Sequence, residues 1–222
     1  MDFTVIICTY NRSNNLPDCF KALEDQLNVE ELDWEVLLVD NNSSDDTKEV
    51  VMNYANKSMI KIRYVHEKQQ GLNYARNLGM REVRGEYFSY VDDDILVNKV
   101  WLRSIYDAFI NNNADAVGGR IHLDKSIKLP KWILPDMYGF LGYQDLGEVP
   151  FQMDGKKNYP FGGNMAFSRK ITKKVGLFNP KLGRKGEGKA RKELFKGAET
   201  DYFHRLSDIE NHRIFYAPDA IV

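Results

Sequence analysis

The sequence predicts an α/β fold with a mostly parallel central sheet and helices on both faces, of the kind that binds nucleotides. In its first half, four runs rich in β-branched and aromatic residues alternate with segments whose apolar residues recur at helical spacing. Strands that alternate with helices in this way form βαβ units, and their crossover helices cover both faces of a parallel sheet. Each of the four runs also ends in polar residues, so we expect one edge of the sheet to gather them.

The first half of the chain, residues 1–122, contains the regular elements. The first helix carries Pro17 in its first turn, where the missing N–H of proline costs least. The predicted strands are the β-branched runs at residues 3–9, 34–40, 60–66, 87–91 and 116–122. Helices are predicted at residues 16–27 and 97–112. Two more are predicted between them, one through Val50 and Tyr54 and one from Leu72 through Leu78.

The second half, residues 123–222, is less regular, and we expect it to complete a single domain with the first half. Residues 124–158 contain three prolines and several aromatic residues. Long loops in compact domains are usually functional, so we expect an acceptor-binding or lid region there. A strand is predicted at residues 161–167, entered through a glycine pair that permits close approach of a ligand.

The last part of the chain combines a basic segment with two regular elements. Residues 181–192 include six basic residues and three glycines, which predicts a flexible loop. A helix is predicted at residues 199–211, followed by a closing strand at residues 214–216.

The composition excludes several classes of protein. Lys and Arg number 31 against 32 Asp and Glu, and the net charge of −1 gives no general attraction to nucleic acid. Cys8 and Cys19 have neither the spacing of a metal site nor a disulfide framework, so we expect core residues in a reducing compartment. The amino terminus has no signal-peptide pattern, and no apolar run is long enough to span a bilayer. We therefore expect a soluble, cytoplasmic protein that associates at most peripherally with a membrane, at the inner face of the plasma membrane.

Three consecutive carboxylates, Asp92, Asp93 and Asp94, follow the fourth predicted strand. On an extended backbone, Asp92 and Asp94 point to one side and Asp93 to the other. Oxygen-rich pairs of this kind suit a hard divalent cation, Mg²⁺ or Mn²⁺, which keeps open positions for phosphate oxygens. The alternative is a solvated turn that caps the next helix, since Asp is a favoured N-cap residue.

Three further charged residues are candidates for binding or catalysis. Asp40 ends the second strand and would accept hydrogen bonds from a nucleobase or ribose, or else cap the Asn-Ser-Ser turn that follows it. Arg76 lies one turn inside a helix that starts at a glycine, where it would hold a diphosphate or instead pair with a surface acid. Glu199 opens a predicted helix and is a candidate general base, although most acids in a first turn only stabilise the helix dipole.

Six motifs together resemble the family 2 glycosyltransferases, of the type that builds bacterial cell-surface polysaccharides. Each motif is weak alone, but the six occur in the order and at the spacing of that family over nearly the whole chain. They are Thr9-Tyr10-Asn11-Arg12, Val39-Asp40-Asn41-Asn42-Ser43-Ser44-Asp45, Gly71-Leu72 with Ala75-Arg76-Asn77, Val91-Asp92-Asp93-Asp94, Gly162-Gly163-Asn164, and Glu199-Thr200-Asp201 through Arg205-Leu206.

The resemblance implies a GT-A-type fold that binds a nucleoside-diphosphate sugar with residues 1–122 and an acceptor with residues 123–222. It further implies transfer of the sugar with inversion, with a divalent cation, Mn²⁺ or Mg²⁺, as the cofactor. The implied nucleotide-sugar ligands are Thr9, Tyr10, Asn11, Arg12, Asp40, Asn42, Arg76, Asp92 and Asp93. The implied metal ligands are Asp94 and Asp92, and the implied acceptor-binding residues are Gly163, Asn164 and Trp132.

One departure from the family pattern concerns the catalytic base. The family has an acidic dipeptide before its last helix, and here the matching positions read Ala198-Glu199. Glu199 takes the place of the second acid, so the resemblance implies that it is the base, with Asp201 as the alternative. Because a glutamate near its ordinary pKa is a weak base, we expect the loop around Trp132 to bury Glu199 and raise its pKa.

A second departure concerns the metal. Members of the family often carry a metal-binding histidine soon after the final strand, and the sequence up to Val222 has none there. We therefore expect either a chain truncated at its carboxyl end, or a metal held by Asp94, phosphates and water alone.

The expected partners are a nucleoside-diphosphate sugar and a glycan or lipid-linked glycan acceptor, in the synthesis of a surface polysaccharide or glycoconjugate. The main alternative is a non-catalytic carbohydrate- or nucleotide-binding module. A sugar-phosphate nucleotidyltransferase is disfavoured because the loop at residues 10–15 has no glycine to cradle a phosphate. The basic segment at residues 181–192 would close over the diphosphate, meet an acidic acceptor or a membrane, or remain a solvated loop.

Overall fold

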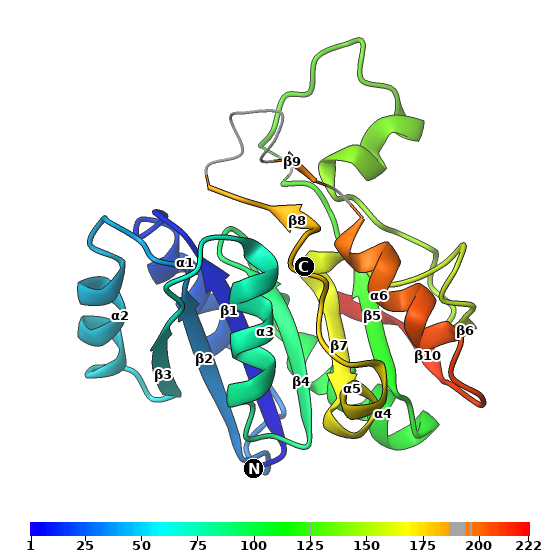
Figure 1. Ribbon diagram of the computed structural model, residues 1–222, viewed down its shortest axis with the longest axis horizontal. Coiled ribbons are helices and arrows are strands. Elements are labelled where there is room, and N and C mark those ends of the chain that lie inside the picture. The colour runs from blue at the N-terminus through cyan, green and yellow to red at the C-terminus, as the bar shows by residue number, and fades with distance from the viewer. Residues whose placement is uncertain (125, 187–193, 196) are drawn as a thin grey trace.

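An eight-stranded sheet forms the centre of the molecule (Figure 1). The computed structural model describes residues 1–124, 126–186, 194–195 and 197–222. The strand order across the sheet is β3-β2-β1-β4-β7-β5-β10-β6. The strands are β1 (Phe3–Thr9), β2 (Trp34–Asp40), β3 (Lys61–His66), β4 (Tyr87–Asp92), β5 (Ala116–Arg120), β6 (Phe151–Met153), β7 (Met165–Ser168) and β10 (Ile214–Ile221).

Most strands of the sheet run in one direction. β1 to β4 pair in parallel, and β5 and β10 pair in parallel with one another. β7 is antiparallel to both β4 and β5, so β5 runs in the direction of β4, and β6 is antiparallel to β10. The prediction of a mostly parallel sheet is therefore confirmed.

The carboxyl ends of three neighbouring strands lie side by side. Thr9 of β1 is in register with Asp40 of β2, and Cys8 is in register with Asp92 of β4. Ligands of open α/β sheets bind at this edge, at the point where the strand order reverses. β1 occupies that point because β2 and β4 flank it.

Helices cover both faces of the sheet, as the sequence predicts. The buried side chains of the helices on each face join a separate hydrophobic cluster, because apolar residues three or four positions apart lie on one side of a helix. One face carries α1 (Leu16–Glu24), α2 (Thr47–Ala55) and α4 (Trp101–Asn112), and the other carries α3 (Leu72–Glu82), α5 (Arg169–Val175) and α6 (Ala198–Ser207).

The strand predicted at residues 161–167 is confirmed only from Met165 onward. A short 3-10 turn, η2 (Gly162–Asn164), replaces its beginning, and β7 starts at Met165. The two glycines are there for close packing within the protein. A Cβ on Gly162 would lie 2.5 Å from Arg76 Nη2 and from Glu199 Oε1, and a Cβ on Gly163 would lie 2.5 Å from Ile95 Cδ1.

Other differences lie at the ends of elements. The first and last predicted helices are shorter and end at Glu24 and Ser207. α4 begins at Trp101 rather than at residue 97, because the Asn98 backbone N–H donates to the Ile221 carbonyl of β10 instead of starting a helix. β10 is longer than predicted and continues to Ile221, with a register irregularity after residue 216.

The short helix α5 is absent from the sequence prediction. It follows β7 directly, and Ser168 is its N-cap: the hydroxyl oxygen accepts a hydrogen bond from the Ile171 backbone N–H. A serine before a short basic segment is the only local signal for this helix, and it is weak without an apolar repeat.

The remaining second half contains little regular structure. Residues 124–158 hold the 3-10 helix η1 (Pro135–Leu141) and the edge strand β6. A flexible loop is predicted at residues 181–192, but its residues Gly183–Arg184 form the short strand β8. β8 pairs with β9 (Leu194–Phe195), which follows the predicted loop. Residues 187–192 of the predicted loop lie outside the described residues. No helix in the described part of the chain has both the length and the apolar character needed to cross a bilayer.

Candidate functional site

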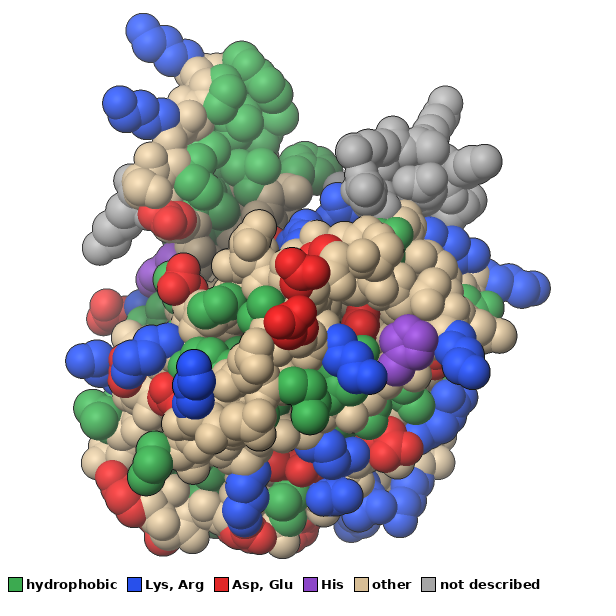
Figure 2. All heavy atoms as spheres, turned by 90° about the vertical axis from the view of Figure 1, so that its left-hand side faces the viewer, with side chains coloured by type: hydrophobic (Ala, Val, Ile, Leu, Met, Phe, Trp, Pro, Cys, Tyr) green, Lys and Arg blue, Asp and Glu red, His purple; other side chains and the backbone are tan. Residues whose placement is uncertain are grey.

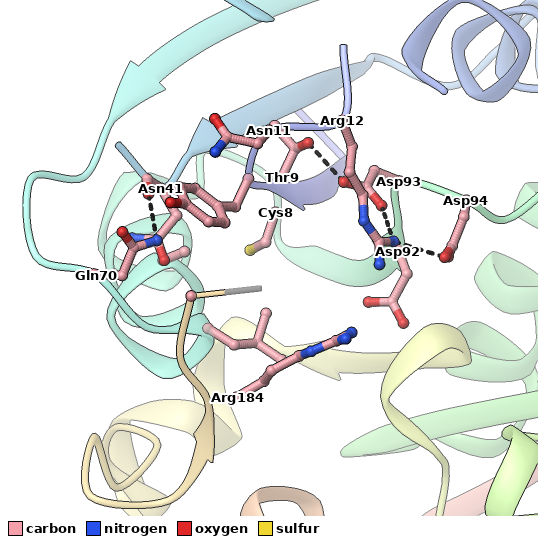
Figure 3. A pocket seen from close by; sticks show the side chains of 14 residues that line it. Cys8, Thr9, Asn11, Arg12, Asn41, Gln70, Asp92, Asp93, Asp94 and Arg184 are labelled. Atoms are coloured by element: carbon pink, nitrogen blue, oxygen red, sulfur yellow. Dashed lines mark hydrogen bonds and ion pairs between the residues drawn. The ribbon is translucent and has the colours of Figure 1, made fainter. Parts of the chain in front are cut away.

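A cavity of about 280 Å³ opens at the carboxyl ends of β1 and β4 (Figure 3). Its walls come from the loops after β1 and β2, the start of α3, the turn after β4, and the β8 segment. The lining residues are Cys8, Thr9, Tyr10, Asn11, Arg12, Asn41, Gln70, Leu72, Ala75, Asp92, Asp93, Asp94, Arg184 and Gly186. Seven of these, Thr9 to Arg12 and Asp92 to Asp94, are among the predicted site residues.

The loop after β1 is fixed to the loop after β2 by paired hydrogen bonds. Asn11 has a φ of 52°, a left-handed conformation that asparagine tolerates better than most residues. Its backbone N–H donates to Ser43 Oγ at 2.9 Å, and its side-chain oxygen accepts from the Ser44 backbone N–H at 2.7 Å. These contacts hold the first loop open above the ends of the strands, so that Thr9 and Arg12 face the aspartates.

Asp93 and Asp94 share one arginine. Arg12 Nη1 lies 3.0 Å from Asp93 Oδ1 and 2.7 Å from Asp94 Oδ2, and the Thr9 hydroxyl donates to Asp93 Oδ2 at 2.6 Å. The predicted alternation, with Asp92 and Asp94 together and Asp93 apart, is therefore wrong. β4 ends at Asp92 and the chain turns, so the extended geometry on which the alternation depends stops there.

Asp92 stands apart from this group and keeps its carboxylate free of hydrogen bonds to other described side chains. Burial raises the pKa of Asp92 to about 6; the charge of Arg76 opposes that rise, and the charges of Asp94, Asp93 and Glu199 add to it. The cavity thus carries more negative charge than its own arginines neutralise.

The donor set fits a hard cation that the protein holds weakly. Among the residues that the structure describes, no group of three or more His, Cys, Asp or Glu is arranged to hold a metal ion. Asp92, with no hydrogen bond to another described side chain, and Asp94, whose side chain is 54% exposed, both offer carboxylate oxygens to the cavity. Oxygen donors of this number suit Mg²⁺ or Mn²⁺ when phosphate and water oxygens complete the coordination.

Arg76 and Glu199 form an ion pair beside this cavity, in which Arg76 is buried and the Glu199 side chain is 27% exposed. Arg76 is 2% exposed, and its Nη1 donates to Glu199 Oε1 at 2.8 Å. The guanidinium also lies over the rings of Tyr90 and Phe178, 5.9 and 5.4 Å from their centroids. In this structure Arg76 therefore contacts the candidate base, and neither residue lines the cavity itself.

The expectation that the Glu199 pKa is raised is wrong. Burial by itself would raise the pKa of Glu199, but the charge of Arg76 and hydrogen bonds from Arg76 and the backbone hold it below its ordinary value. Trp132 does not bury it, since that side chain is 70% exposed. Asp201, the alternative base, is bound to Arg205 at 2.9 Å within the same helix.

Asp40 and Asn42 lie next to the cavity but do not line it. Asp40 is 3% exposed, and its two carboxylate oxygens accept hydrogen bonds from the Ser43 backbone N–H and the Tyr64 hydroxyl. Asn42 is exposed, with a φ of 65° that the turn requires. The neighbouring Asn41 takes the place on the wall: its side-chain oxygen accepts from the Gly71 backbone N–H at 2.7 Å.

The three predicted acceptor residues are not brought together. Asn164 is fully buried; its amide donates to the Arg120 and Ala220 carbonyls and its oxygen accepts from the Trp101 indole N–H. Gly163 packs against Ile95, and Asp92 Oδ2 would lie 3.4 Å from a Cβ at that position. Trp132 lies in the exposed segment between β5 and β6.

Several residues of the cavity wall are missing from the sequence prediction. Arg184 extends into the cavity from β8 (Figure 3), and its place in the basic segment was the only signal for it. Gln70 holds the Asn41 carbonyl at 3.2 Å. Cys8 lies at the base of the cavity, where burial raises its thiol pKa to about 12, so it is a neutral wall residue rather than a nucleophile.

Comparisons with known proteins agree with this geometry. The sequence model of glycosyl transferase family 2 matches residues 4–176. The glucosyl-dolichyl phosphate glucuronosyltransferase of Haloferax volcanii is 23% identical over 223 residues, which cover 100% of this chain and 68% of the relative. The cholesterol galactosyltransferase of Borreliella burgdorferi is 35% identical over 167 residues, which cover 72% of this chain and 45% of the relative.

A solved structure shows the same fold. The mannosyltransferase PcManGT from Pyrobaculum calidifontis, in complex with GDP-Man and Mn²⁺, matches with a TM-score of 0.67 at 20% identity, over 99% of this chain and 55% of that one. The fold of this chain is thus the GT-A type, as the resemblance implies. The chain spans only part of the length of each of these three proteins.

Proposed function

The chain belongs to glycosyl transferase family 2, and we propose that it moves a sugar from a nucleoside-diphosphate sugar to an acceptor hydroxyl with inversion. The observation that carries this proposal is the grouping of Arg12, Thr9 and the three aspartates in one cavity at the carboxyl ends of β1 and β4. That edge of the sheet is the general ligand site of open α/β folds. A cavity rich in both carboxylates and arginines suits a ligand with phosphates, hydroxyls and a cation.

We assign the donor to this cavity. The nucleoside would lie on the loop from Thr9 to Arg12, beside Asn41, with Asp40 and Asn42 behind it as the supports of the second loop. Asp92 and Asp93 would face the ribose and the adjoining phosphate. Arg184, which reaches the cavity from β8, and Arg76, buried beside Asp92, would provide positive charge toward the diphosphate.

We further propose that a divalent cation, Mn²⁺ or Mg²⁺, binds with the donor at Asp94 and Asp92. The excess negative charge of the cavity and the pKa of about 6 at Asp92 support this assignment, because a cation there would stabilise the ionised carboxylates. PcManGT, which has the same fold, is solved with Mn²⁺ and a nucleotide sugar. When bound, the cation would neutralise the charge that develops on the departing nucleoside diphosphate.

Glu199 is the base that we propose for the acceptor. Arg76 keeps Glu199 ionised, so its carboxylate is in the form that accepts a proton. The acceptor oxygen would lose its proton to Glu199 as it attacks the anomeric carbon from the face opposite the leaving group. The ion pair makes Glu199 a weaker base than burial alone would, and its position is set by Arg76 and by the first turn of α6.

The acceptor that we propose is a glycan or lipid-linked glycan, used by a cytoplasmic enzyme at the inner face of the plasma membrane. The names of two relatives support a lipid on the acceptor side, since one names glucosyl-dolichyl phosphate and the other names cholesterol. Gly163, Asn164 and Trp132 remain our candidates for the acceptor side, with Asn164 acting through its support of the Gly162-Gly163 turn rather than by contact.

A panel of nucleotide sugars tests the proposal. The protein is heated with UDP-, GDP- and dTDP-linked sugars in the presence of Mn²⁺, and we expect one nucleotide class to raise the Tm in a manner reversed by chelation. Release of the matching nucleotide with an acceptor present then shows turnover. Binding without any release across a panel of glycan acceptors would favour a non-catalytic module, and no stabilisation by any nucleotide would contradict the donor site.

A further inference from the structure

The chain between α5 and β8 is fastened to α3, although it contains neither a helix nor a strand. We define residues 178–182 as the connecting segment. Its first residue, Phe178, forms two hydrogen bonds of 2.8 Å with the Asn77 side chain. The Phe178 backbone N–H donates to the Asn77 oxygen, and the Asn77 amide donates to the Phe178 carbonyl. Both residues are buried, so the connecting segment begins at a fixed point on the helix.

Asn73 holds the other end of the connecting segment. Its amide nitrogen donates to the carbonyls of Asn179 and Leu182, at 2.8 and 3.1 Å, and Leu182 directly precedes β8. Gly183, the first residue of β8, lies so close that a Cβ there would be 3.1 Å from the Asn73 Cγ. Because Asn73 and Asn77 are four residues apart, they lie on the same face of α3, and the segment runs along that face.

The residue that follows this contact is Arg184, whose side chain points into the cavity (Figure 3). β8 lies at the beginning of α3 (Figure 1). In the first turn of that helix Leu72 lines the cavity, while the next residue, Asn73, holds the chain that leads into β8. The position of the Arg184 backbone relative to the cavity therefore depends on Asn73.

General positive charge would not bring a diphosphate to this cavity. On the face shown in Figure 2, Lys and Arg side chains are interspersed with Asp and Glu, and the net charge of the chain is −1. The cavity itself contains three aspartates. A diphosphate in it therefore needs particular arginines at particular positions, because an arginine binds phosphate through directed hydrogen bonds.

The Asn73 side chain is 1% exposed, and its oxygen accepts no hydrogen bond from any residue that the structure describes. A buried acceptor without a partner lowers stability, so the two bonds that the amide donates are what this side chain contributes. We propose that Asn73 is a positioning residue, which holds β8 so that Arg184 contacts the diphosphate of the donor. This inference rests on the proposed function, because it places the donor in the cavity.

A role in positioning and a role in stability alone make different predictions for Arg184. If Asn73 only stabilises the fold, its loss weakens diphosphate binding equally with and without the Arg184 guanidinium. If Asn73 positions Arg184, its loss matters only while that guanidinium is present. A displacement of about 1 Å is enough to break a charged hydrogen bond between the arginine and a phosphate.

A double-mutant cycle on the whole chain tests this proposal. Calorimetry with Mn²⁺ measures the binding of UDP, GDP and dTDP to the natural chain, Asn73→Leu, Arg184→Gln and the double variant. Leucine has the branched shape of asparagine but no amide. For the diphosphate that the natural chain binds most tightly, we expect each single variant to bind about tenfold more weakly. The double variant should bind no more weakly than Arg184→Gln alone.

Two further variants complete the test. The control Asn112→Leu removes an amide bond to the Ala108 carbonyl in α4, on the other face of the sheet, and should bind as the natural chain does. Gly183→Ala disturbs the same contact from β8 and leaves α3 unchanged, so it serves if Asn73→Leu does not fold. Gly183 has a φ of 88° and its Cβ would meet Asn73, so this variant should also bind more weakly, but not in the Arg184→Gln background.

Each result has a distinct meaning. Equal binding by Asn73→Leu and the natural chain, or losses that add up in the double variant, overturns the proposal. Arg184→Gln that binds the diphosphate as the natural chain does overturns it as well. These three results leave the donor site in place. If the natural chain binds none of the three diphosphates, the donor site itself fails, and the positioning role of Asn73 fails with it.

Discussion

The guanidinium of Arg76 lies 2.8 Å from the carboxylate of Glu199, although the two residues are 123 positions apart in the sequence. The pair joins the two halves of the chain, because Arg76 belongs to α3 and Glu199 opens α6. It lies directly under the Gly162-Gly163 turn and next to Asp92. The proposed base is thus positioned by a residue of the nucleotide-binding half.

The first prediction concerns pH. In the natural chain Arg76 holds the Glu199 pKa below its ordinary value of 4.5. At saturating donor and Mn²⁺, which would keep Asp92 ionised, turnover should therefore not fall on the acid side until the pH is below that value. In Arg76→Gln the burial remains without the charge, the pKa rises, and the acid limb of turnover should move up by about one pH unit or more. Measured pH profiles of both proteins check this, with Arg205→Gln as the control that leaves the pair intact.

The same pair contributes to stability with a definite sign. A carboxyl whose pKa is lowered in the folded state stabilises it above the unfolded pKa, and this contribution disappears as the pH falls through the folded pKa. We expect urea denaturation at pH 7 to show Arg76→Gln destabilised by roughly 1 to 3 kcal/mol, because the half-buried carboxylate of Glu199, 27% exposed, loses its charged partner. An acid limb that stays in place in Arg76→Gln would show that Glu199 is not the group that titrates.

The second prediction separates the two candidate bases. Glu199→Gln should keep donor binding but reduce turnover about 100- to 10,000-fold, as loss of a general base does. Asp201→Asn should remain active, since Asp201 is held by Arg205 within α6. Single-turnover kinetics with calorimetric donor binding measures both effects. If Asp201→Asn is inactive and Glu199→Gln is active, the base is misassigned.

The third prediction uses two glycines. A Cβ on Gly162 would lie 2.5 Å from both partners of the ion pair, whereas a Cβ on Gly139 meets nothing within 4 Å. Gly162→Ala should therefore displace the ends of both side chains and lower turnover, and Gly139→Ala should leave turnover and Tm unchanged. Equal activity of the two alanine variants would contradict the view that turnover depends on the exact position of this pair.

The fourth prediction concerns the buried aspartate of the cavity. Asp93 is 4% exposed and accepts a 2.6 Å hydrogen bond from the Thr9 hydroxyl. Thr9→Val removes this bond to a charged group and should lower the free energy of unfolding by about 1.5 to 3 kcal/mol. Ser104→Ala, which removes a hydroxyl from the partly exposed face of α4, should change it by no more than about 0.5 kcal/mol. Similar losses in the two variants would contradict the anchoring role of Thr9.

The sequence was a good guide to features that depend on local pattern. The strand with Asp92 at its end and the loop from Thr9 to Arg12 follow from β-branched runs and the residues after them. A parallel sheet then brings these ends to one edge, so their meeting in one cavity was predictable. The split between Asp92 and the pair of Asp93 and Asp94 was not, because it depends on where the strand stops and the chain turns.

The features of the site that the sequence did not predict depend on contacts between distant segments of the chain. Nothing near Arg76 in the sequence indicates Glu199 as its partner, and nothing near Asp40 indicates the Tyr64 hydroxyl that takes one of its oxygens. The side chain of Asn164 looks like a ligand in its motif, but Trp101 and two carbonyls surround it in the fold. Trp132 and Phe140, between β5 and β6, resemble core residues by type, and only the structure shows that their side chains are 70% and 77% exposed.

The fifth prediction tests the donor site, on which the whole account depends. The Asp94 side chain is 54% exposed, and among the described residues it pairs with Arg12 alone. Asp94→Ala should therefore fold normally while it removes a carboxylate from the cation. Asp18→Ala changes an exposed acid in the first turn of α1 and is the matched control.

The most direct measurement is calorimetric titration of the nucleoside diphosphate found in the panel, with Mn²⁺ and with chelator, into these proteins. We predict Mn²⁺-dependent binding to the natural chain and to Asp18→Ala, and loss of that binding in Asp94→Ala. Binding to Asp94→Ala that equals the natural chain and still needs Mn²⁺ would contradict the assignment of the Asp92 to Asp94 cavity as the metal-dependent donor site.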